Sequence, residues 1–123
     1  MEINVSSLLK ARDVFESFRK NLNTDQEKAG AIQAFEFCYE LSWKTMKKVL
    51  SFRGIEVSTP RDTFREAALA HLIENPRIWF DFIGKRKLTV HTYDQENVEA
   101  ILSIFDLFSR ELNALIENLE KPL

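Results

Sequence analysis

The chain has little cysteine or histidine, the residues that stabilise small proteins without a packed core through disulfides or bound metal. It has one cysteine in 123 residues, Cys38, which excludes an internal disulfide and makes the reducing cytoplasm the expected location. Its two histidines lie twenty positions apart and form no zinc-binding pattern with Cys38. No apolar run approaches the ~20 residues of a membrane-spanning helix, and apolar and charged residues alternate near the N-terminus, unlike in a secretion signal.

Glycine, proline and net charge are also low, with three Gly, three Pro and a formal charge of −2. The chain has no glycine-rich phosphate loop and no nucleophile elbow. It is not a broadly basic nucleic-acid binder, so any RNA contact requires a local patch or a groove formed by dimerisation. A modest basic cluster is typical of a solvated face and offers at most a phosphate contact: Lys44, Lys47, Lys48 and Arg53.

Apolar residues are abundant, and they recur every three or four positions, as on the buried face of a helix. Together, 45% apolar residues and ten Phe are enough to fill the core of one domain, residues 1–123. The periodicity predicts five helices: about Val5–Asn23, about Glu27–Phe52, Pro60 to between His71 and Glu74, a fourth from Pro76 that weakens across 84–87, and a long last one that follows the cap Thr92-Tyr93-Asp94 and carries apolar residues up to Leu119.

Capping residues support these boundaries. Thr59-Pro60 and Asn75-Pro76 each place a capping side chain before a proline suited to the first helical turn, and Gly54 suits a left-handed helix end. Short connections and no strand signal predict an all-α, five-helix up-and-down bundle. The second helix is expected at its centre. The wide apolar arcs of the second and last helices favour a homodimer.

The segment from Arg86 to Asp94 brings a guanidinium, an imidazole and a phenol together between two helices. Arginine suits bidentate phosphate recognition, and histidine titrates near neutral pH. In RNA cleavage, His91 would take the proton of a 2′-hydroxyl while Arg86 stabilises the phosphorane, with no metal or cofactor. The spacing by itself is equally typical of a histidine at a helix end and a solvated arginine, and Tyr93 by itself is typical of packing.

A second candidate is a polar stripe on the second helix. Glu36, Glu40 and Lys44 follow one another at intervals of four and therefore share a face. Either they form a solvated ladder of ion pairs, or they line a groove opposite Arg86 and His91. Nothing in the sequence separates the pKa values of the two carboxylates, so we favour the ladder over acid–base catalysis and keep the groove as a binding hypothesis.

Three segments in this order resemble the nucleotidyltransferase substrate-binding proteins of the HEPN superfamily. The first runs from Ile32-Gln33 through Phe35-Glu36-Phe37 and Tyr39-Glu40-Leu41 to Trp43-Lys44; the second is Ser58 to Asp62 with Arg65-Glu66-Ala67; the third is Trp79, Arg86 and His91 to Asp94. Together they span about residues 28–96, and helices of suitable length flank them.

The resemblance implies a helical bundle, usually dimeric, that partners a minimal nucleotidyltransferase. The motif Arg-x4-His-x-Tyr, filled here by Arg86, His91 and Tyr93, is similar to that of HepT toxins, which are metal-independent RNases of toxin–antitoxin pairs. It implies catalytic roles for Arg86 and His91 and AMP addition at Tyr93 by the partner. Lys87 stands where the family often has Asn. Since the branch was named for binding a substrate for its nucleotidyltransferase, a non-catalytic nucleotide- or substrate-binding subunit is the alternative, with Glu36, Glu40, Lys44 and Lys87 as binding residues.

Overall fold

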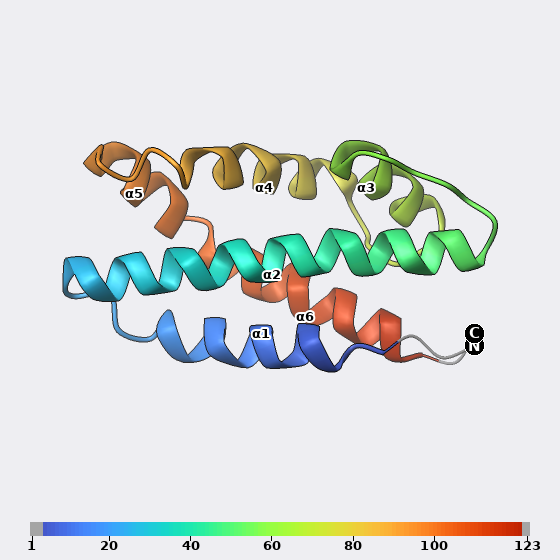
Figure 1. The fold of residues 1–123 in the computed structure, drawn as a ribbon, viewed down its shortest axis with the longest axis horizontal. Helices are drawn as coiled ribbons and strands as arrows, with labels where there is room; N and C mark the ends of the chain where they lie inside the picture. Colours follow the sequence, from blue (N-terminus) through green and yellow to red (C-terminus); the bar gives the residue numbers. More distant parts are fainter. Residues whose placement is uncertain (1–3, 122–123) are drawn as a thin grey trace.

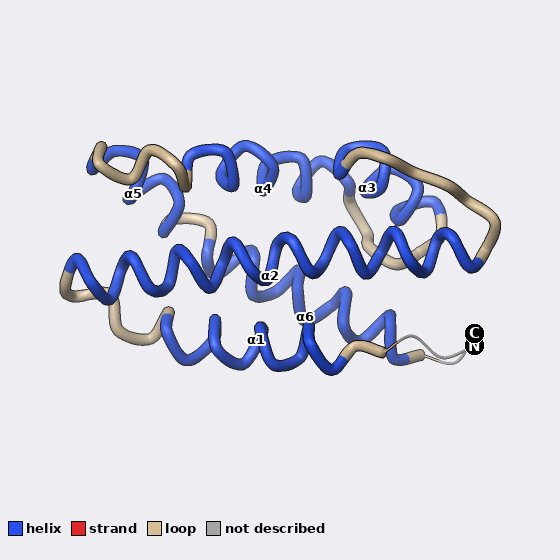
Figure 2. Tube along the Cα trace, viewed as in Figure 1, coloured by secondary structure: helices blue, strands red, loops and turns tan. Residues whose placement is uncertain are grey.

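The computed structural model describes residues 4–121, which form six helices and no strand (Figures 1 and 2). The helices are α1 (Ser6–Phe18), α2 (Asp25–Phe52), α3 (Pro60–Leu69), α4 (Pro76–Leu88), α5 (Gln95–Leu102) and α6 (Phe105–Glu120). Within the described range, none of them is both long and apolar enough to cross a bilayer.

The long helices alternate in direction, as the prediction of an up-and-down bundle requires. In Figure 1, α1 and α4 run one way and α2 and α6 run the other, with α2 between α1 and α4. The short helices α3 and α5 lie near the two ends of α4, so the turn between α4 and α5 lies at the end of the bundle where α2 begins. The predicted central position of the second helix agrees with its ten buried residues.

The predicted number of five helices was wrong, because the last predicted helix is two. It breaks at Ser103 and Ile104, where the Ser103 hydroxyl donates to the carbonyl of Ala100 at 2.6 Å and the chain turns into α6. The apolar stripe continues across the break without Gly or Pro. Helical periodicity therefore cannot distinguish one helix from two that share a buried face. The break lets α5 pack on α4 while α6 crosses towards α1.

Side-chain caps and two left-handed residues set most helix ends. Thr24 and Glu27 form a reciprocal capping box at the start of α2, and Thr59 accepts from the Asp62 amide at the start of α3. Gly54 has φ +81° after α2, as predicted. His71 has φ +64° after α3, a conformation that disfavours any residue with a Cβ atom.

The core is built around aromatic rings from most of the helices. Phe35 of α2 packs edge-on against Phe108 of α6 with ring centroids 4.8 Å apart, and Phe108 contacts Phe82 of α4 at 5.1 Å. Phe82 in turn contacts Trp79, the largest fully buried side chain. This continuous packing fixes α4 against α2 and so fixes the position of the turn that follows α4.

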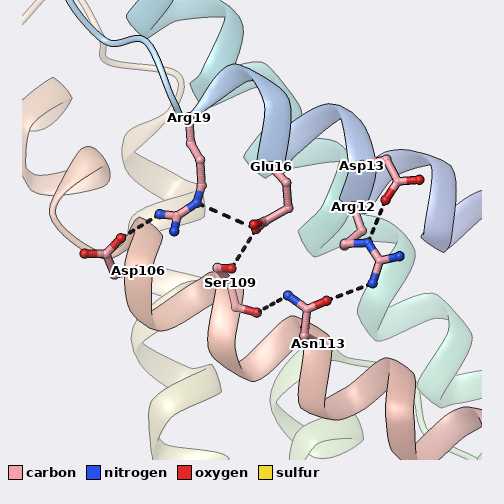
Figure 3. Close-up of polar contacts among 7 residues, drawn as sticks. All are labelled: Arg12, Asp13, Glu16, Arg19, Asp106, Ser109 and Asn113. Carbon is pink, nitrogen blue, oxygen red and sulfur yellow. Dashed lines mark hydrogen bonds and ion pairs between the residues drawn. The ribbon is translucent and has the colours of Figure 1, made fainter.

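A polar seam joins α1 to α6 on the opposite side of the bundle (Figure 3). Arg19 contacts Asp106 at 2.6 Å, the Ser109 hydroxyl donates to Glu16 at 2.6 Å, and Arg12 donates to Asn113 at 2.8 Å. These contacts hold the first helix to the last; in Figure 1, α1 lies on the other side of α2 from α4.

Candidate functional site

Arg86 lies in the last turn of α4, with its side chain turned towards α2. Its Nε donates to Glu40 at 3.3 Å, and its Nη1 lies 3.8 Å from a Glu36 oxygen. Nη1 also donates to the Thr89 hydroxyl at 3.0 Å, and that hydroxyl donates to the Arg86 carbonyl at 2.7 Å. Nη2 makes no hydrogen bond within residues 4–121, so one edge of the guanidinium is available to a ligand.

Glu36 and Glu40 line a groove with Arg86, whereas Lys44 and His91, which the groove hypothesis also included, do not line it. The groove has a volume of about 450 Å³ and is completed by Ala29, Gln33 and Phe37 of α2. The other carboxylate oxygen of Glu40 accepts a hydrogen bond from the indole N–H of Trp43 at 3.0 Å, which holds the carboxylate in place. Two carboxylates beside one guanidinium leave the groove with a net negative charge.

His91 and Tyr93 lie in the exposed turn between α4 and α5. The Tyr93 hydroxyl is 3.2 Å from His91 Nδ1, and the two rings meet edge-on. The backbone carbonyl of His91 accepts from the Asp94 amide at 3.2 Å and from the Asn97 side chain at 3.1 Å. The imidazole is therefore anchored through its backbone and reaches solvent, where a substrate can approach it.

The two tyrosines of the chain have opposite environments. Tyr93 is 85% exposed, whereas Tyr39 of α2 is 2% exposed. Burial raises the pKa of Tyr39, and the neighbouring charge of Glu40 acts in the same direction while Arg86 opposes it. Tyr39 thus stays a neutral core residue at neutral pH, and Tyr93 is the tyrosine that another protein can reach.

The predicted site residues fall into two neighbouring groups and two isolated lysines. Arg86, in the last turn of α4, is grouped with Glu36 and Glu40 in the middle of α2, and His91 is grouped with Tyr93 in the turn after α4. Lys44 and Lys87 are exposed and make no hydrogen bond or ion pair within the described residues.

Sequence reasoning missed the residues that complete these groups. Thr89 is buried and orients Arg86, but a single threonine after a helix carries no recognisable signal. Gln33 and Phe37 could have been found, because they lie at helical spacing from Glu36 and Glu40 and therefore share a face with them. Nowhere in residues 4–121 do His, Cys, Asp and Glu side chains gather in a group that could hold a metal ion.

Comparison with known proteins gives a family for the whole described chain. Residues 4–121 match the family model described as nucleotidyltransferase substrate binding protein like. A Haemophilus influenzae protein named probable ribonuclease HepT is 40% identical over 98 residues, which cover 76% of this chain and 67% of that protein.

Two solved structures share the fold. One, from Haemophilus influenzae, is described as revealing the fold of a substrate binding domain of a nucleotidyltransferase; it is 33% identical, with a TM-score of 0.86, and the match covers 96% of this chain and 100% of that one. The other, from Thermus thermophilus, is 25% identical with a TM-score of 0.86 and coverage of 93% and 99%. Since the family model matches nearly the whole chain, this protein belongs to the nucleotidyltransferase substrate-binding family.

Proposed function

We propose that this protein is the HEPN-type partner of a minimal nucleotidyltransferase in a toxin–antitoxin pair, and that it is a metal-independent RNase controlled by AMP addition at Tyr93. The observation that carries the proposal is the exposed pair of His91 imidazole and Tyr93 hydroxyl, 3.2 Å apart, directly after the helix that holds Arg86. Similarity to the probable ribonuclease HepT supports it.

His91 and Arg86 supply the groups that RNA cleavage requires. The neutral imidazole takes the proton of a 2′-hydroxyl, the 2′-oxygen attacks the adjacent phosphorus, and the bond from phosphorus to the 5′-oxygen breaks. The products are a 2′,3′-cyclic phosphate and a 5′-hydroxyl, which receives a proton from the imidazolium or from water. The free Nη2 edge of Arg86 stabilises the added negative charge on the phosphorane oxygens.

AMP addition at Tyr93 would inhibit RNA cleavage, because the modified side chain lies close to His91. The phenol oxygen attacks the α-phosphorus of ATP on the nucleotidyltransferase, pyrophosphate leaves, and the phenol proton is released. The new phosphodiester would lie beside His91, because the hydroxyl that carries it is 3.2 Å from the imidazole. Its negative charge favours the imidazolium, which cannot act as a base, and its bulk and charge repel an RNA phosphate.

Dimerisation is part of the proposal, because apolar side chains surround the site without cover. Phe37 in the groove is 59% exposed and Val90 in the α4–α5 turn is 68% exposed. A second copy packed across the groove and the α4–α5 turn would bury both and deepen the groove. Light scattering at micromolar concentration is expected to give the mass of a dimer, and a monomer there would contradict this part of the proposal.

The direct test is cleavage of total tRNA by the purified protein in EDTA. We expect wild type to cleave and to leave 2′,3′-cyclic phosphate ends, and we expect Arg86→Ala and His91→Ala to lose cleavage by about 10²-fold or more. His71→Asn is the matched control, since it removes the other histidine and asparagine tolerates the left-handed backbone there. No cleavage by folded wild-type dimer would refute the RNase.

The acceptor role of Tyr93 has a separate test. Tyr93→Phe should retain RNA cleavage, because the phenol donates no group to the reaction, and should lose AMP acceptance from ATP and the partner nucleotidyltransferase, measured by intact mass. Tyr39→Phe is the control: because Tyr39 is buried, this substitution should leave AMP acceptance unchanged. Continued modification of Tyr93→Phe at the wild-type level would refute the assignment.

One observation favours the alternative of a non-catalytic nucleotide- or substrate-binding subunit. Glu36 and Glu40 already neutralise Arg86, so the groove suits an uncharged base or sugar as well as it suits phosphate. Phe37 and Gln33 there offer a stacking surface and an amide. If wild type binds a nucleotide in titration calorimetry and never cleaves RNA, this alternative replaces the RNase.

A further inference from the structure

The charges of this nearly neutral chain are unevenly distributed. Residues 44–87, which include the last third of α2, all of α3 and nearly all of α4, have ten Lys and Arg against five Asp and Glu, a net charge of +5. The rest of the chain has seven against fourteen, a net charge of −7. The small total of −2 is therefore the sum of an acidic part and a basic segment that ends at Lys87, directly after Arg86.

Within this segment, α3 and α4 bring cations together around one aromatic ring. The guanidinium of Arg61 lies 4.4 Å from the centroid of the half-buried Phe80 ring, and that of Arg65 lies 5.6 Å from it. Asp62 pairs with Arg65 at 3.2 Å, whereas Arg61 makes no ion pair within residues 4–121. An arginine stacked on an aromatic face keeps its N–H edges free for phosphate oxygens.

Helix α4 extends this cluster towards the reaction site. Arg77, Phe80 and Lys87 are separated by three and seven residues and so lie on one face of the helix, which is roughly 15 Å long between Arg77 and Lys87. Both cations are exposed and have no ion pair in the described structure; Asp81 is the one acid of α4 and lies beside Phe80 in sequence. The line of cations ends next to Arg86, a few residues before His91.

We propose that Arg61, Arg65, Arg77, Phe80 and Lys87, the α3–α4 basic face, bind the phosphate backbone of the RNA substrate outside the groove and lead the strand to the α4–α5 turn. The inference rests on the proposed function, because it names the surface that the RNase substrate contacts. A linear row of cations with an aromatic ring suits a phosphate backbone better than it suits a compact acidic protein surface. The groove itself, with its two carboxylates, supplies little attraction for phosphate.

The test measures binding of a labelled single-stranded oligoribonucleotide by fluorescence anisotropy between roughly 50 and 200 mM salt. All proteins carry His91→Ala, so that the RNA stays intact. The test variant combines Arg61→Gln, Arg77→Gln and Lys87→Gln. The control variant makes the same charge change elsewhere, with Lys10→Gln, Lys20→Gln and Arg110→Gln, which are exposed on α1, after α1 and on α6.

Each phosphate contact with a single strand contributes about 0.7 to the salt slope, so the test variant should lose about 2 from that slope. We expect it also to bind at least about tenfold more weakly at roughly 0.15 M salt, while the control variant keeps the slope. Thermal unfolding confirms that both variants remain folded. An unchanged slope, a slope that falls equally in the control, or no RNA binding by any protein would overturn the inference.

Two further readouts separate this inference from the proposed function. Cleavage by wild type with an unchanged slope in the test variant would overturn the basic face alone. A reduced slope with no cleavage by wild type would overturn the RNase and support the face as an RNA-binding surface. If the test variant loses affinity for the partner nucleotidyltransferase and keeps its affinity for RNA, the face belongs to the protein partner and the inference is wrong.

Discussion

Replacing Glu40 by Gln separates two effects of this carboxylate: it pairs with Arg86, and it is expected to repel the phosphate of the proposed RNA ligand. Glutamine has nearly the same shape and keeps an oxygen that can accept a hydrogen bond. The ion pair spans 3.3 Å between side chains that are 30% and 36% exposed, so solvent screens it. Losing it should lower the free energy of unfolding by about 0.5–1 kcal/mol.

The effect on RNA binding should have the opposite sign. A phosphate on Nη2 of Arg86 would lie roughly 7 Å from the Glu40 carboxylate, and at an effective dielectric constant of about 40 their repulsion is about 1.2 kcal/mol. Screening with a Debye length of about 8 Å at physiological salt reduces this to about 0.5 kcal/mol. Glu40→Gln should therefore bind RNA about two- to sevenfold more tightly, with the larger gain at low salt.

Anisotropy titrations of His91→Ala with and without Glu40→Gln measure this gain, and thermal unfolding measures the cost in stability. Glu117→Gln is the control for net charge, because Glu117 is exposed on α6 away from the groove. Weaker RNA binding by Glu40→Gln would refute the reasoning, since it would mean that the carboxylate serves the ligand rather than opposing it. An equal gain in RNA affinity in Glu117→Gln would show that the effect comes from the change in net charge and not from the position of Glu40.

Three further predictions concern stability. Gly84→Ala in α4 should raise the free energy of unfolding by about 1 kcal/mol, because a Cβ there meets nothing within 4 Å and alanine is the better helix former; denaturant titration measures the gain. His71→Gly should raise it by about 0.5–1 kcal/mol in the same assay by relieving the left-handed backbone after α3, and no gain would contradict the strain. Burial raises the pKa of Cys38 from 9.0 to about 12, so the unfolded thiol loses its proton first and stability should fall by up to about 1.4 kcal/mol per pH unit above pH 9. That part of the fall should be absent in Cys38→Ala.

The sequence was most informative where a local rule applies. Thr59-Pro60 and Asn75-Pro76 predicted the starts of α3 and α4, because capping and proline geometry depend only on neighbouring residues. The apolar spacing predicted the buried face of α2, and Phe35, Cys38 and Met46 are all fully buried. The segment from Arg86 to Asp94 was expected between two helices; Arg86 lies in the last turn of α4 and His91 in the turn after it.

Helix ends without such signals were predicted less well. The first helix was expected to reach Asn23 and ends at Phe18, since its apolar pattern continues into a turn that still packs on the core through Leu22. The fourth helix was expected to weaken across 84–87 and instead continues to Leu88. Three basic residues in its last turn interact favourably with the helix dipole and so stabilise this end.

The sequence by itself determined the all-helical class and the local helix starts, because these follow from spacing and chain-local hydrogen bonds. The roles of Arg86, His91 and Tyr93 rest on the family resemblance and stay predictions. Only the tertiary structure decided that the apolar stripe of the last predicted helix belongs to two helices. The break between α5 and α6 depends on the packing of α5 on α4 and of Phe105 and Phe108 on Phe15. The tertiary structure also decided that Glu36 and Glu40 meet Arg86, and that Tyr93 is exposed while Tyr39 is buried. These contacts join residues far apart in the chain, and no local pattern encodes which of them the folded core brings together.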